Sequence, residues 1–349
     1  MKRFLFSIIA MGFLHAPIFA AATNLPDISV LGDLTAQTST DESYLDRNRV
    51  TLREIELALQ GYLYPEMRAD IFLAMHRHDG AFEPEVCEAS VSVLHLFIDG
   101  FGLQAGKIHI DFGKLNKIHQ HERPFIDQPL VLSNFFGPDD GLVGEGAVLN
   151  YLFPLPFFLR LEGGVFWVPV EAHDHADGEE PAEFGMAGKT YTARLWSSFS
   201  LGDKAELEIG ASGAQGNGSH YLEHTDEAVV AGGDLTLRTW LSTYQRLIFQ
   251  NEFLYLNRRV PTGTLDRFGA YSYCGFQFDK YWDAGLRYDW SENAFPDKMT
   301  SSLISAIGAF RLTETTRFRL QYGFDPDALS HSAALQLVFG IGPHTHPLQ

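Results

Sequence analysis

The sequence predicts an all-β fold, a transmembrane antiparallel β-barrel of about sixteen strands with a long inward-folding loop. Three observations lead to this prediction. Apolar and polar residues alternate with a period of two along most of the chain. The alternating segments are roughly 9–14 residues long, which is the length of tilted strands that cross a bilayer. The connections between them are short and long in turn.

The alternation leaves each segment with one apolar face and one charged face. In the segment 281–290, Trp282, Leu286 and Trp290 fall on one face, and Asp283 and Arg287 fall on the other. A soluble β-sandwich would show the same alternation. In a sandwich, short and long connections are not expected to alternate along the chain. Short turns that alternate with longer loops are typical of outer-membrane barrels.

The connections divide into two sets along the chain. The short ones are 64–66, 99–100, 154–156, 202–203, 242–243, 279–280 and 313–315. The long ones are 38–48, 78–83, 113–141, 169–187, 215–228, 260–266, 291–300 and 325–330. The longest of these connections, 113–141, carries Phe125, Leu130 and Phe135, so it should pack against another part of the protein. Because sixteen strands enclose an aqueous lumen, we expect this loop to fold inward and constrict it.

The first residues indicate a secretory signal. Lys2 and Arg3 precede an apolar stretch, 4–19, and three alanines follow it. We therefore expect a signal peptide at 1–22 and a single barrel domain at 23–349. The barrel pattern places the protein in the cell outer membrane of a Gram-negative bacterium.

Composition limits the partners. The chain has 26 Lys and Arg residues against 44 Asp and Glu residues, for a net charge of −18. This balance argues against nucleic acid and favours cations. The 28 Phe residues are many for an acidic soluble protein, and a surface that faces lipid would explain them. By strand parity the two cysteines, Cys87 and Cys274, should both point outward, on segments too distant for a disulfide.

Histidine pairs of the form His-x-His are the most informative chemical feature. Side chains at i and i+2 share a face in extended backbone, and imidazole suits zinc, copper, iron and nickel. The candidate metal ligands, all at or in long connections, are His76, His78, His119, His121, His173, His175, His220 and His224. The pair His119 and His121 is preferred because its loop should lie in the pore. Ordinary loop histidines are the alternative, since a chain with 14 histidines contains such spacings by chance.

Charged residues are expected on the inner faces and in the constriction. The loop residues Lys117, Glu122, Arg123 and Asp127 should line the constriction. Inner-face charges of both signs are expected to form a solvated lining: Arg160, Arg194, Arg238, Arg246, Arg287, Arg317, Arg319, Glu54, Glu56, Glu162, Glu206, Glu208 and Glu252. The chain has no G-x-S-x-G nucleophile motif and no glycine-rich loop that opens a helix, so we predict that it is not an enzyme.

A set of residues in the stretch 106–142 carries a family resemblance. The set is Gly106-Lys107, Phe112-Gly113-Lys114, Asn116, His119-x-His121, Pro124, Asp127-x-Pro129-Leu130, Asn134 and Gly141-Leu142, with further matches in 26–33 and 53–57. It resembles a family of Gram-negative outer-membrane porin-like proteins, distantly similar to phosphate-selective porins, of which some members are described as zinc-regulated. The dense lysine and arginine ladder expected for phosphate has no counterpart here.

The resemblance and the histidine pairs together suggest a function. We expect an outer-membrane porin-like channel for small solutes, including divalent transition-metal ions such as zinc or their small chelates. No cofactor would be required, and zinc would bind only transiently. The alternative is a non-conducting surface barrel that binds metal or a partner. Outer-membrane lipid is an expected partner, and the resemblance also implies a homotrimer.

Overall fold

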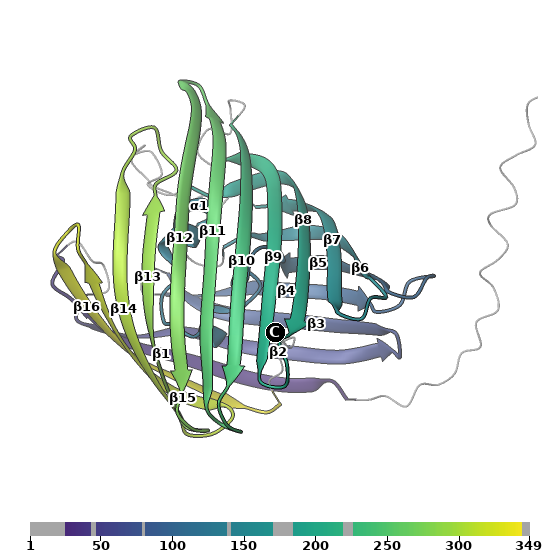
Figure 1. Cartoon of the computed structure of the whole chain (residues 1–349), viewed down its shortest axis with the longest axis horizontal. Helices are drawn as coiled ribbons and strands as arrows, with labels where there is room; N and C mark the ends of the chain where they lie inside the picture. The colour runs from purple at the N-terminus through teal and green to yellow at the C-terminus, as the bar shows by residue number, and fades with distance from the viewer. Residues whose placement is uncertain are drawn as a thin grey trace, which may run out of the picture.

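The computed structural model describes residues 25–42, 47–78, 81–137, 141–169, 184–218 and 226–343. Sixteen antiparallel strands form a closed barrel, in which each strand pairs with the next and the first pairs with the last (Figure 1). The predicted fold class and strand number are confirmed. Among the described residues no helix is long and apolar enough to span a bilayer.

The strands are 9 to 16 residues long. They are β1 (Asp27–Ser39), β2 (Arg49–Tyr64), β3 (Met67–His78), β4 (Ala81–Val93), β5 (Phe101–His109), β6 (Val143–Leu152), β7 (Phe158–Val168), β8 (Met186–Ser200), β9 (Ala205–Gly218), β10 (Glu227–Trp240), β11 (Arg246–Val260), β12 (Gly263–Gln277), β13 (Trp282–Glu292), β14 (Thr300–Arg311), β15 (Thr316–Asp325) and β16 (Ser330–Ile341). Two short helices, η1 (Gln120–Glu122) and α1 (Leu130–Phe136), lie between β5 and β6.

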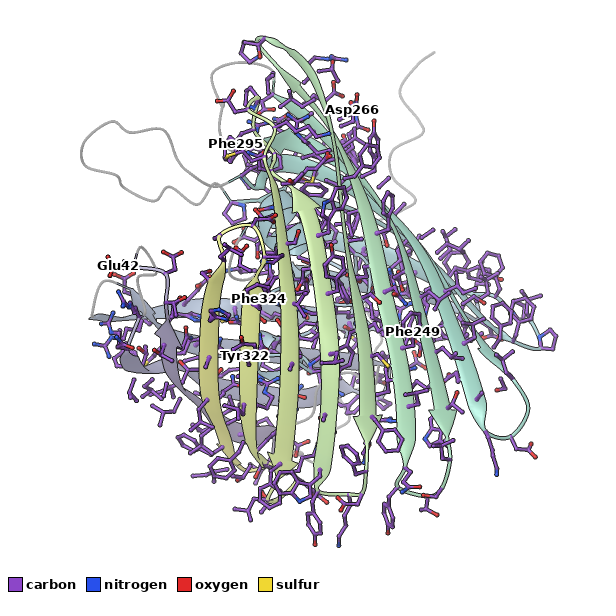
Figure 2. All side chains as sticks on the ribbon, turned by 60° about the vertical axis from the view of Figure 1, so that its left-hand side comes forward. Glu42, Phe249, Asp266, Phe295, Tyr322 and Phe324 are labelled. Carbon is purple, nitrogen blue, oxygen red and sulfur yellow. The ribbon has the colours of Figure 1, made fainter. Side chains whose placement is uncertain are left out.

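Two of the predicted long connections are wrong. The strands β11 and β12 continue towards each other until only Pro261 and Thr262 separate them. Cross-strand hydrogen bonds explain the extension, because the Tyr255 hydroxyl and the Asn257 amide donate to Asp266 at 2.5 and 2.8 Å. Asp266 lies in this protruding part of the barrel (Figure 2). In the same way β3 runs on to His78 and β4 begins at Ala81.

The outer surface of the barrel is apolar. Large side chains on the outer face of the strands are exposed, among them Phe249, Leu286, Leu320 and Tyr322. Figure 2 shows Phe249 and Tyr322 projecting from this outer wall. An apolar band around a closed barrel is what a lipid-facing surface requires.

The connection from β5 to β6, residues 110–142, folds into the lumen as predicted; we call it the lumen loop. Its apolar side chains are buried against inward-facing residues of the wall, so the barrel holds a hydrophobic core in its interior. On the loop side this core contains Phe112, Leu115, Phe125, Val131, Leu132 and Phe135, and on the wall side Phe166, Leu254, Tyr271, Tyr273 and Ile307.

Candidate metal centre in the lumen

The preferred histidine pair lies inside the barrel. His119 and His121 flank the first residue of η1 on the lumen loop, and both are buried. Their rings face the wall made by β2 and β4, at 5.6 Å between ring centroids. The expectation that this loop carries two imidazoles into the lumen therefore agrees with the structure. Whether they bind metal stays a prediction.

Carboxylates from the wall meet both rings. The Nδ1 atom of His119 lies 3.0 Å from an oxygen of Glu56, and its Nε2 lies 3.7 Å from an oxygen of Glu88. The Nδ1 atom of His121 lies 3.6 Å from an oxygen of Glu54. The sequence identified Glu54 and Glu56 only as general lining. Glu88 was not identified, because one carboxylate on a strand carries no motif.

A third imidazole was also missed. His109, the last residue of β5, lies with its ring centroid 4.9 Å from that of His119. Its backbone N–H donates to Glu88 at 3.1 Å, and its Nδ1 lies 3.3 Å from the carbonyl oxygen of Asn116. In the sequence, the alternation of Lys107, His109 and Asp111 with isoleucines was a signal that His109 belongs to a polar face.

These residues form two overlapping sets of donor atoms. One set is Glu56, His119 and His121, and the other is Glu88, His109 and His119. In each set, one ligand atom from every residue lies within 4.8 Å of the others. Imidazole nitrogens with carboxylate oxygens suit zinc and similar transition metals better than calcium or magnesium. We call these five residues the luminal cluster.

The electrostatics of His119 allow the cluster to exist without metal. Burial alone would lower the pKa of His119, but hydrogen bonds and charge attraction from Glu56 and Glu88 raise it well above its ordinary value. A protonated His119 therefore sits between two carboxylates when no ion is bound. A metal ion would have to displace this proton to use the ring as a ligand.

The opposite wall holds the lumen loop by arginines. Arg319 on β15 donates to the carbonyls of His121 and Phe125, each at 3.1 Å, and to that of Arg123. Arg317 donates to the carbonyl of His121 as well. The loop thus crosses from an acidic wall, β2 and β4, to a basic wall at β15.

The four residues predicted to line the constriction have different roles. Lys117 lies 3.5 Å from Asp111, and Glu122 is partly exposed. That these two residues line the constriction stays a prediction. Asp127 is also partly exposed and pairs with Arg287 at 2.9 Å. Arg123 is a correction, since it is buried and donates to Ile118 and Gln128 within the loop itself. The guanidinium of Arg123 therefore stabilises the fold of the loop through these hydrogen bonds.

The expectation that Cys87 points outward is wrong. The register of β3 and β4 shifts between Phe72 and Leu73, opposite Cys87, which is the extra residue of a β-bulge. A bulge turns two consecutive side chains to the same side of the sheet, so Cys87 joins Glu88 on the inner face. Cys87 is buried, Cys274 is exposed as predicted, and neither forms a disulfide.

Among the remaining predicted ligands, the side chain of His76 alone belongs to the part of the chain that the structure describes. His173, His175, His220 and His224 lie outside the described residues, as does the side chain of His78. His76 is described, and its Nε2 atom lies 3.4 Å from the sulfur of Cys87. The structure therefore brings His119, His121 and His76 into one region of the inner wall.

The lumen is filled more completely than predicted. The charged lining was expected to be solvated, but Arg194, Glu208 and Glu252 are buried. Lys114 of the lumen loop pairs with Glu208, and its backbone N–H donates to Glu252. At this level the lumen loop packs directly against the wall at β9 and β11.

Comparisons with known proteins agree with this architecture. No family model matches the chain. An uncharacterized protein of Aquifex aeolicus is 28% identical over 295 residues, 71% of this chain. The chain spans about 60% of the length of that relative.

Solved structures cover nearly the whole chain at low identity. OmpF of Salmonella typhi, in complex with daunomycin, aligns with a TM-score of 0.61 at 10% identity, over 90% of this chain and 97% of that one. The chain has the fold of the outer-membrane porins. The anion-selective porin of Comamonas acidovorans has a TM-score of 0.57 at 12% identity, over 90% and 100% of the two chains. The trimer form of OmpT from Vibrio cholerae aligns with a TM-score of 0.56 at 10% identity, over 91% of this chain and 100% of that one.

For this porin-like barrel the comparisons support the general part of the family resemblance. The neighbours are porins and outer-membrane proteins, not enzymes. The zinc-regulated and phosphate-selective parts of the resemblance stay predictions.

Proposed function

We propose that this porin-like barrel lies in the outer membrane of a Gram-negative bacterium and passes small solutes, among them divalent transition-metal ions such as zinc or their small chelates. One observation supports the metal part most strongly. His119 and His121, on the loop that crosses the lumen, meet carboxylates of the wall at 3.0–3.7 Å.

The mechanism is stepwise exchange of weak ligands. The two donor sets of the luminal cluster share His119, so an ion can leave one set as it enters the other. Conduction requires that each site bind weakly enough to release the ion. The net charge of −18 would concentrate cations near the barrel. Zinc is the cargo in this proposal, and no resident cofactor is required.

Passage needs the lumen loop to shift. The loop is tied to β15 through Arg319 and to β9 and β11 through Glu208 and Glu252. Burial of these groups favours a second candidate function, a non-conducting barrel that binds metal at the cell surface. In an open aqueous lumen, water would hydrate Arg319, Glu208 and Glu252 instead. A conductance measurement therefore distinguishes the channel from the non-conducting barrel.

The assembly is part of the proposal. One structural neighbour is described as a trimer form, and a homotrimer with lipid around its outer wall fits the exposed apolar surface of this barrel.

The test is transport by the purified protein in planar bilayers and zinc-loaded vesicles. We expect discrete, cation-preferring conductance steps that micromolar zinc modulates, and a zinc flux that His119→Ala/His121→Ala lowers severalfold. The control is His95→Ala/His331→Ala, which removes two imidazoles that lie outside the lumen. Equal zinc flux in the two double variants would exclude the metal pathway, and folded protein without conductance would favour the non-conducting barrel.

A further inference from the structure

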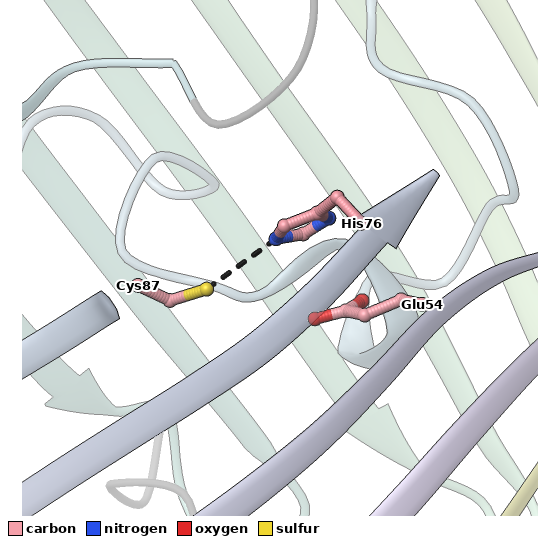
Figure 3. Close-up of side chains that lie close together, drawn as sticks. All are labelled: Glu54, His76 and Cys87. Carbon is pink, nitrogen blue, oxygen red and sulfur yellow. Dashed lines mark hydrogen bonds between the residues drawn. The ribbon is translucent and has the colours of Figure 1, made fainter. Parts of the chain in front are cut away.

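A second group of donor atoms lies in the wall beside the luminal cluster. Glu54, His76 and Cys87 come from the neighbouring strands β2, β3 and β4, and Figure 3 shows their side chains side by side. One ligand atom from each lies within 4.8 Å of the other two. Glu54 stands directly opposite His76 in the register of β2 and β3, and the β4 bulge turns Cys87 inward to join them.

The spacing of sulfur and nitrogen matches a tetrahedral metal site. Zinc binds cysteine sulfur at about 2.3 Å and histidine nitrogen at about 2.05 Å, so a tetrahedral angle places the two atoms about 3.5 Å apart. The observed distance from His76 Nε2 to Cys87 Sγ is 3.4 Å. Two of the three ligands therefore already have the separation that a bound ion would impose. The Glu54 carboxylate has an oxygen within 4.8 Å of both atoms and would move closer to complete the set.

The surroundings favour a bound ion over hydrated groups. Cys87 packs with Ala58, Phe72 and Ala74 in a small buried apolar cluster. Such a shell limits access of water and strengthens metal–ligand bonds. An oxygen of Glu85 lies 4.0 Å from His76 Nε2, so Glu85 or a water would supply the fourth position.

The group also connects to the luminal cluster. The carboxylate of Glu54 lies 3.6 Å from Nδ1 of His121, so one residue borders both sets of donors. Phe72 lies between them, with its ring centroid 5.1 Å from that of His119.

We propose that Glu54, His76 and Cys87 form a transition-metal site that selects thiophilic ions such as Zn²⁺ and Cd²⁺ over Mg²⁺ and Ca²⁺. A thiolate ligand prefers soft or borderline ions, whereas the alkaline-earth ions take oxygen ligands. On binding, the Cys87 thiol gives its proton to water and the sulfur becomes the ligand. This inference deepens the proposed function by naming the class of ion. It concerns binding and is tested without conduction, so the two proposals fail separately.

Cadmium titration of the full-length folded barrel in detergent tests the site. Thiolate bound to Cd²⁺ gives an ultraviolet charge-transfer band that imidazole and carboxylate do not give. We expect the band to saturate at one Cd²⁺ per protein in the native protein and in Cys274→Ser. No band should form in Cys87→Ser. Because Cys87 and Cys274 are the two cysteines of the chain, each variant serves as the matched control of the other.

The other two ligands are tested by affinity. His76→Asn and Glu54→Gln should keep the thiol but weaken cadmium binding at least about tenfold. Zn²⁺ should displace the bound Cd²⁺ and abolish the band, whereas Mg²⁺ and Ca²⁺ at the same concentration should leave the band unchanged. No band in folded native protein, a band that persists in Cys87→Ser, or unchanged affinity in both ligand variants would overturn the site. The thiol and imidazole would then be a simple hydrogen-bonded pair.

Discussion

At the scale of single residues, two bulges decide which side chains reach the lumen. The extra residue of β4 is Cys87, and the register of β1 and β2 shifts between Asp33 and Leu34, opposite the extra residue Arg53. Arg53 then donates to Asp33 and to the carbonyl of Ile126 in the lumen loop. Both side chains would point elsewhere in a regular strand, because side chains alternate between the two faces. A local irregularity thus contributes both a proposed metal ligand and a tether of the loop.

Arg319 gives a test of how the lumen loop is anchored. Arg319→Ala would leave the buried carbonyls of Arg123 and Phe125 without this donor, and an unsatisfied buried acceptor costs about 1–3 kcal/mol. We expect the free energy of unfolding in phospholipid vesicles to fall by that amount, as measured by urea titration. The control is Arg259→Ala, an exposed arginine whose ion pair with Glu227 should contribute less than about 1 kcal/mol. Equal losses in both variants would contradict this anchoring role.

At the scale of elements, the lumen loop depends on close approach to the wall. The helix α1 packs on β12 at Gly269, where an added Cβ would lie 2.5 Å from a methyl carbon of Val131. Near the start of the loop, Gly113 has a φ of 59°, in the left-handed region, and lies next to the carboxylate of Glu252. The apolar residues of the loop predict that it folds inward. These two glycines are what let it lie against the wall.

Gly269→Val tests the position of α1. The larger side chain would overlap Val131, and overpacking of this kind costs about 1–3 kcal/mol. The same change at Gly308, where nothing lies within 4 Å of an added Cβ, should cost much less. Unfolding midpoints of the two variants in guanidinium chloride would show the difference. Equal midpoints would mean that α1 is not held closely against β12.

At the scale of the whole molecule, the barrel presents an apolar wall to lipid and a filled interior. Leu286, exposed on β13, lies midway between Trp282 and Trp290 on the same face. Tryptophans are enriched at the two membrane interfaces, so this spacing places Leu286 near the middle of the bilayer. The protruding ends of β11 and β12 would then stand outside the lipid.

Arginine substitution tests this placement. Leu286→Arg should lower the stability of the folded barrel in vesicles by about 2–4 kcal/mol, as expected for a cation at the midplane. Thr264→Arg, exposed on the protruding end of β12, should cost less than about 1 kcal/mol. Reversible unfolding in vesicles of fixed composition would measure both. A small cost at Leu286 would contradict a lipid-facing position.

Much of the architecture was predictable from the sequence because it is local. Alternation of side chains along a strand, as in 281–290, is a property of neighbouring residues, and so is the apolar content of the lumen loop. The same reasoning failed at 260–266, where cross-strand bonds to Asp266 extend β11 and β12 beyond the apparent turn. Strand ends depend on the partner strand, which the sequence of one segment does not contain.

The sequence by itself determined the strand number, most of the inner and outer faces, and a histidine pair on an inward loop. Only the tertiary structure decided which groups meet in the lumen. His119 reaches Glu56 and Glu88, and His76 reaches Cys87, because barrel closure and register place β2, β3 and β4 side by side beneath the loop. These contacts join residues distant in the chain, and a single register shift in β4 changes them. The metal site proposed at Cys87 therefore depends on a bulge that no sequence pattern showed.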